Sequence, residues 1–86
     1  MFKPIAPFEL KINTTTIKIR EVDIPGYRAF QAMFSSKREP ITIARATNRK
    51  GNKFWTTIPE NESRQNEAEG LGRLVEEYLA KLEEEK

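Results

Sequence analysis

The sequence predicts an α+β fold, in which an antiparallel β-sheet of four to five strands packs against one C-terminal α-helix (order ββββα). Three observations lead to this prediction. Residues 8–58 contain short runs of alternating apolar and polar residues, turn-forming residues separate these runs, and residues 63–82 repeat apolar side chains every three or four positions. A chain of 86 residues has room for one core, so we expect a single domain over residues 1–86.

The first two strands are predicted in residues 8–12 and 17–24. Both segments alternate apolar with polar side chains, as a strand with one buried face does. The alternation in the second segment changes phase by one residue, which favours a β-bulge at Arg20 or Glu21. Pro25-Gly26 then predicts a type II turn, because Pro presets the first corner and Gly accepts the positive φ of the second.

Residues 27–34 are ambiguous between a strand and a helix. Phe30, Ala32 and Phe34 would share a strand face, whereas Phe30, Met33 and Phe34 would share a helix face. A strand is favoured, since turn residues on both sides leave only about eight residues, which is short for a helix.

A basic hairpin is predicted from residue 41 to residue 58. Residues 41–47 are rich in β-branched side chains, residues 48–52 have the composition of a turn, and residues 53–58 form the returning strand. Pro59 ends that strand because it has no N–H to donate to a ladder.

The C-terminal helix is predicted from about Ser63 to Leu82, with Asn61 or Ser63 as its N-cap. Its apolar stripe follows three- and four-residue spacing. Gly70 and Gly72 each oppose helix formation by about 1 kcal/mol, so close approach of a sheet or a partner helix should compensate for them. The stripe consists of Ala68, Leu71, Val75, Tyr78, Leu79 and Leu82.

The composition argues against catalysis. The chain contains no Cys and no His, which removes the commonest zinc ligands, thiol nucleophiles and the usual general base. We therefore expect no enzyme, no metal, no cofactor and no small-molecule substrate. The chain also has no apolar segment that could serve as a signal peptide or membrane span, so we expect a cytoplasmic protein with no membrane partner.

Charge is distributed unevenly along the chain. Residues 28–53 hold seven basic residues and one acidic residue, whereas residues 60–86 hold nine glutamates and four basic residues. An acidic helix on one side of the sheet would leave the opposite face as the basic one. Such a face would attract polyanions.

The basic hairpin carries the candidate binding site. Phe54 and Trp55 are neighbours in a strand and must point to opposite faces. If Phe54 is buried, Trp55 is exposed and bases can stack on it while nearby cations follow the phosphates. In the other interpretation, Trp55 packs under the helix and the cations only solubilise loops. The candidate nucleic-acid-binding residues are Arg28, Arg45, Arg49, Lys50, Lys53, Trp55 and Tyr27.

Two families resemble this pattern. The layout of residues 16–82, with basic aromatic strands before one helix, resembles the transcriptional coactivators that bind single-stranded DNA. Gly26-Tyr27-Arg28-Ala29, the strand from Phe54 to Pro59 and the helix after it are similar to the stage V sporulation protein G family. Both resemblances imply nucleic-acid binding.

The sequence thus predicts a small non-enzymatic nucleic-acid-binding protein, with single-stranded DNA or RNA as its partner. The alternative is a protein-interaction or regulatory module, such as a phage or plasmid factor, that acts through its acidic helix or its basic hairpin. A homodimer is expected, because the domain is small and its helix has two glycines and a long apolar stripe.

Overall fold

The chain folds into five strands followed by one helix. The structure is a computed structural model that describes residues 5–84, so the first four and last two residues of the predicted domain lie outside it. The predicted α+β class, with its strands before a single C-terminal helix, is confirmed, and the number of strands is five. The elements are β1 (Phe8–Ile12), β2 (Thr15–Ile24), β3 (Tyr27–Phe34), β4 (Ile41–Thr47), β5 (Lys53–Thr57), the 3-10 turn η1 (Glu62–Arg64) and α1 (Gln65–Glu84).

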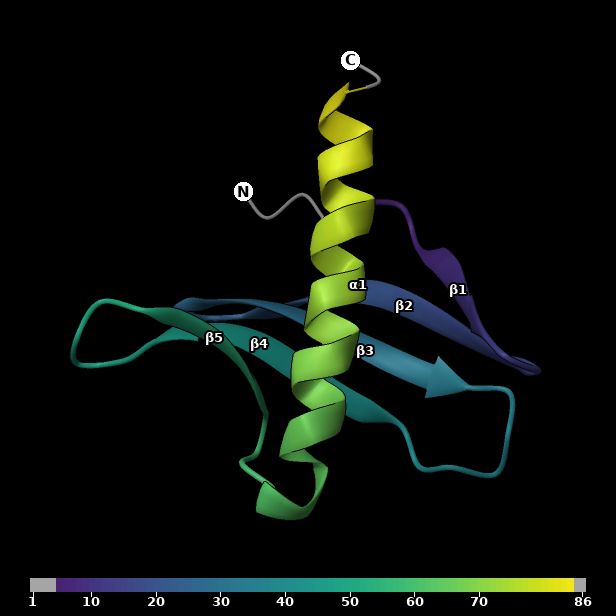
Figure 1. The fold of residues 1–86 in the computed structure, drawn as a ribbon, viewed down its shortest axis with the longest axis horizontal. Coiled ribbons are helices and arrows are strands. Elements are labelled where there is room, and N and C mark those ends of the chain that lie inside the picture. The colour runs from purple at the N-terminus through teal and green to yellow at the C-terminus, as the bar shows by residue number, and fades with distance from the viewer. Residues whose placement is uncertain (1–4, 85–86) are drawn as a thin grey trace.

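The strands form one curled antiparallel sheet in the order β1-β2-β3-β4-β5. Each strand pairs with its neighbour in sequence, so short turns suffice to connect them. The helix α1 crosses one face of this sheet, and its C-terminal end projects beyond the strands (Figure 1). We call the face under α1 the covered face and the face turned away from α1 the open face.

Turn residues act where the sequence predicts. Gly26 has a φ of 84°, and the Pro25-Gly26 turn joins the paired residues Ile24 and Tyr27. The turn between β4 and β5 places Gly51 at a φ of 85°. At this turn, the Asn48 side chain accepts hydrogen bonds from the backbone N–H groups of residues 50 and 52. Residues 27–34 are a strand, as favoured.

The bulge predicted at Arg20 or Glu21 is wrong. The pairing of β2 with β3 runs without interruption from Ile17 opposite Phe34 to Ile24 opposite Tyr27. The change of phase marks the point where the apolar side chains of β2 move from the covered face to the open face. The alternation itself is regular, and what changes is which face carries the apolar residues.

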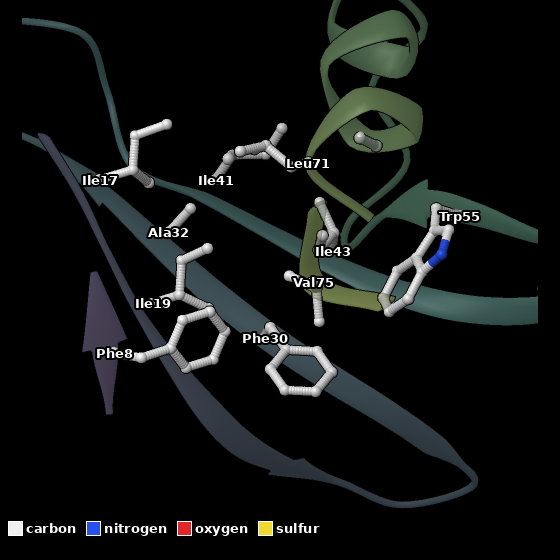
Figure 2. Packing of buried hydrophobic residues seen from close by; sticks show 11 residues of the cluster. Phe8, Ile17, Ile19, Phe30, Ala32, Ile41, Ile43, Trp55, Leu71 and Val75 are labelled. Atoms are coloured by element: carbon white, nitrogen blue, oxygen red, sulfur yellow. The ribbon is translucent and has the colours of Figure 1, made fainter. Parts of the chain in front are cut away.

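The core lies between the covered face and α1. Phe30, Ile19, Ile43 and Val75 are its largest fully buried side chains. Figure 2 shows how buried residues of the strands meet Leu71 and Val75 of the helix. Burying each such side chain contributes about 1.5–3 kcal/mol. At the β1 edge, the rings of Phe8 and Tyr78 stack with centroids 3.7 Å apart.

The start of α1 is tied to the loop between β3 and β4. Asn61 caps η1, since its side chain accepts a hydrogen bond from Ser63 N–H at 3.1 Å. Glu67 accepts hydrogen bonds from the guanidinium groups of both Arg38 and Arg64. Arg64 also donates to the carbonyl oxygen of Glu39 at 2.9 Å. These contacts fix the direction in which the helix leaves the sheet.

Candidate nucleic-acid interface

Trp55 lies on the covered face, so its predicted outward orientation is wrong. The side chain is only 7% exposed and packs beneath α1 (Figure 2). Its Nε1 donates a hydrogen bond to Glu76 Oε1 at 2.8 Å, and the centroid of its ring lies 6.0 Å from the centroid of the Phe30 ring. The interpretation in which Trp55 packs under the helix is confirmed, and this residue is removed from the surface on which bases could stack.

Pairing with β4 decides this orientation. Ile43 faces the core and lies opposite Thr57, so Thr57 and, two residues earlier, Trp55 must face the core as well. The helix accepts the indole because Gly72 lies directly above it, and a Cβ at this position would overlap the Trp55 ring. The predicted close approach is therefore found at Gly72. Gly70 has open space around it and needs no such explanation.

Two of the predicted phosphate-binding cations are engaged in ion pairs. Arg28 Nε lies 3.0 Å from Glu21 Oε2, and Arg45 Nη2 lies 3.6 Å from Glu76 Oε1. Register places Arg28 and Arg45 on the covered face, where Arg28 meets Glu21 of β2 and Arg45 meets Glu76 of α1. The expectation that the face opposite the helix holds these cations is therefore wrong, because opposite charges meet at the edge of the covered face instead.

The other predicted cations surround the turn between β4 and β5. Arg49 and Lys50 are exposed in this turn, and Lys53 is exposed at the first position of β5. Among the described residues, no ion pair involves any of these three. They form a basic tip at the end of the sheet where Tyr27 also lies, because β3 begins beside the end of β4 (Figure 1).

Two aromatic side chains are exposed on the open face. Tyr27 is 51% exposed and Phe54 is 39% exposed. Phe54 lies opposite Ala46, and extending the β3–β4 register by two residues places Tyr27 on the other side of Ala46. The face that the helix leaves uncovered therefore carries an exposed aromatic pair, which consists of Tyr27 and Phe54 and does not include Trp55.

The open face also carries cations that the sequence reasoning missed. Lys18 and Arg20 are two residues apart on β2 and therefore share a face. Lys18 lies opposite Met33, and Arg20 Nε donates a hydrogen bond to Gln31 Oε1 at 2.8 Å. Met33 is 49% exposed. Alternation along β2 places these two cations on the same face as Ile24, as a strand without a bulge requires.

Two hollows mark the ends of this face. One has a volume of about 260 Å³ and is lined by residues that include Tyr27, Phe54 and Glu60. The second, of about 290 Å³, is lined by residues that include Lys18 and Met33. Tyr27 and Met33 are six residues apart on β3, so about 20 Å separates the hollows along the strand. The face can therefore contact an extended ligand at several points.

Other kinds of site have no support in the described part of the chain. Between residues 5 and 84 no cluster of three or more acidic, His or Cys side chains is placed to hold a metal ion. None of the described helical segments combines the length and the apolar character needed to cross a membrane. Comparisons of the chain with protein-family models, with curated proteins and with solved structures find no match.

Proposed function

We propose that this protein binds single-stranded nucleic acid on the open face of its sheet and catalyses no reaction. The observation that carries the proposal is the pair of exposed aromatic rings, Tyr27 and Phe54, on the one sheet face that the helix leaves free. Base stacking on an aromatic side chain contributes about 1–3 kcal/mol for each base. A single strand offers unpaired bases to such rings, whereas a duplex does not.

Cations lie where they would follow the phosphates of a strand on this face. Lys18 and Arg20 lie along β2, and Arg49 and Lys50 lie in the turn beside Tyr27 and Phe54. Four phosphate contacts on a single strand give a slope of log K against log[salt] of about −3. Arg28 and Arg45 contribute less, because each lies beside a glutamate.

The test is a titration of labelled single-stranded DNA, single-stranded RNA and duplex at two salt concentrations, with fluorescence anisotropy of the label as the measure of binding. We expect salt-sensitive binding of single strands, weakened about tenfold or more by Tyr27→Ala and by Phe54→Ala. Ile12→Ala is the matched control, because Ile12 is similarly exposed, at 41%, but lies on β1 away from the aromatic pair. Trp55 is buried, so its fluorescence reports on folding and should change little on binding.

Absence of binding at low salt would contradict the proposal. So would Tyr27→Ala and Phe54→Ala variants that bind as tightly as the natural chain. In either case the alternative, a protein-interaction module acting through the basic hairpin or the acidic helix, becomes the leading function. Part of that helix is already used internally, since Glu67 and Glu76 contact arginines of the sheet and its loops.

The proposal includes a homodimer and a cytoplasmic location. Support for the dimer comes from Leu74 and Leu82, which stay half-buried on a helix whose C-terminal end extends past the sheet (Figure 1). Sedimentation equilibrium measures the mass directly, and a monomer at all concentrations would contradict this part of the proposal. Nucleic-acid binding on the open face does not depend on it.

A further inference from the structure

The hollow between Tyr27 and Phe54 has a carboxylate among its lining residues. We propose that this hollow is a pocket for one guanine base, with the Glu60 carboxylate accepting two hydrogen bonds from the base's Watson–Crick edge. This inference rests on the proposed function and adds a base preference to it. It assigns a role in recognition to an acidic residue on a surface that otherwise attracts polyanions.

The walls of the hollow suit a flat apolar ring. Tyr27 and Phe54 contribute aromatic side chains, and Ile24 and Pro59 contribute aliphatic surface. Ala46 lies between the two aromatic residues and has no side chain beyond Cβ, so a ring can approach the sheet closely there. The volume of about 260 Å³ leaves room for one base together with some water. Stacking on these walls would hold any base, so the walls alone specify none.

Glu60 supplies the specificity. It is exposed beside the hollow, and within residues 5–84 no hydrogen bond or ion pair occupies its carboxylate. An ionised carboxylate only accepts hydrogen bonds and accepts two in parallel from a suitable donor pair. The Watson–Crick edge of guanine presents two adjacent donors, N1–H and the N2 amino group. Adenine and cytosine pair one amino donor with an acceptor, and thymine and uracil flank one N–H with two carbonyl oxygens.

The negative charge of Glu60 also separates the roles of the two parts of the surface. A carboxylate repels phosphates, so a strand with its backbone near Glu60 is disfavoured and a strand with a base edge there is favoured. The cations that meet phosphates lie elsewhere, at Arg49 and Lys50 in the turn and at Lys18 and Arg20 on β2. Backbone affinity and base identity therefore depend on different residues, and one can be changed without the other.

The test compares an all-thymine tract with four tracts of the same length whose central base is guanine, hypoxanthine (the base of inosine), adenine or cytosine. Inosine lacks only the N2 amino group of guanine. We expect the natural chain to bind the guanine tract at least about fivefold more tightly than the inosine tract. Glu60→Gln should remove this preference while binding to an all-thymine tract stays the same or strengthens. Glu62→Gln is the control, because it removes the same charge from an exposed residue that does not line the hollow.

Equal binding of the guanine and inosine tracts by the natural chain would overturn the guanine pocket. If the all-thymine tract still binds in a salt-dependent manner, the proposed function survives that result. A guanine preference that persists in Glu60→Gln would also overturn the pocket, since another residue would then carry the preference. Failure of every tract to bind at low salt would overturn both proposals together.

Discussion

Phe54 and Trp55 are adjacent in β5 and have opposite environments. Trp55 is 7% exposed beneath α1, whereas Phe54 is 39% exposed on the open face. Both are large aromatic residues in the same short strand, so residue type does not account for the difference. What differs is the surface that each face meets: one has a helix with a glycine at the point of contact, and the other has solvent. The comparison shows that helix coverage divides this sheet into a structural face and a face available for binding.

The largest expected effect comes from removing the indole on the covered face. Trp55→Ala should lower the free energy of unfolding by about 3–5 kcal/mol, because it leaves a cavity under α1 and deprives Glu76 of its hydrogen-bond donor. Phe54→Ala should cost only about 1 kcal/mol, since that side chain is already partly in water. Urea unfolding followed by circular dichroism measures both, because Trp55 is the only tryptophan and cannot serve as the probe.

Similar losses for these two substitutions would break the distinction between the faces. A small domain can fail to fold after losing several kcal/mol, so Trp55→Phe provides a second measurement. This variant keeps an aromatic ring under Gly72 but cannot donate to Glu76. We expect a loss of about 1–2 kcal/mol from it.

The two helix glycines sharpen the same comparison at an intermediate scale. Gly72→Ala should cost about 1–3 kcal/mol, because its Cβ would overlap the Trp55 ring. Gly70→Ala should stabilise the protein by about 0.5–1 kcal/mol, because it gains helix propensity and its Cβ meets nothing. The propensity gain is common to both variants, so the difference in their thermal midpoints isolates the contact with Trp55. Effects of the same sign and size would show that the helix does not sit closely on β5.

An effect smaller than the loss expected at Gly72 concerns how the helix is anchored beside the covered face. Hydrogen bonds from Arg38, and then from Arg64, lower the pKa of Glu67 from its ordinary value of 4.5 to about 2. A lowered pKa in the folded state gives stability that is fully present above about pH 4.5 and is lost as the pH falls toward 2. The group is partly exposed, so solvent screening limits its contribution to about 1 kcal/mol.

Glu67→Gln tests this anchor. At pH 7 it should unfold at lower urea than the natural chain, and the difference should shrink as the pH falls from about 4.5 to about 2. Glu77→Gln is the matched control, since Glu77 is an exposed helix residue with no ion pair among those described. A difference that is independent of pH would mean that packing of the Glu67 side chain matters more than its charge.

Local patterns predicted the elements of the fold well. The alternation in residues 8–12 and the Pro25-Gly26 pair gave the correct strand and turn, because these features depend on residues that are close in sequence. The bulge in β2 was predicted wrongly, since a change of phase was attributed to an extra residue when it marked a change of face. Gly72 correctly indicated a close approach to the helix, and the structure shows that the approaching residue is Trp55.

The candidate site was predicted only in part. Tyr27 is exposed on the open face and Arg49 and Lys50 are exposed beside it, but Phe54 was assigned to the core. Residues 53–58 place apolar or aromatic side chains on both faces, so periodicity alone has no means of choosing between them. Lys18 and Arg20 were likewise not assigned to the site, because the candidate residues were taken from the basic hairpin and from Tyr27 and Arg28.

The sequence by itself determined that this protein has several strands, tight turns between them and one amphipathic helix, because each of these is specified by neighbouring residues. Only the tertiary structure decided which aromatic ring is buried, which arginines are paired and which sheet face stays open. Those outcomes depend on contacts between residues far apart in sequence, such as Trp55 with Gly72 and Arg45 with Glu76. The pairing of β4 with β5 and the position of α1 set these contacts, and no local pattern specifies which two residues meet in each of them.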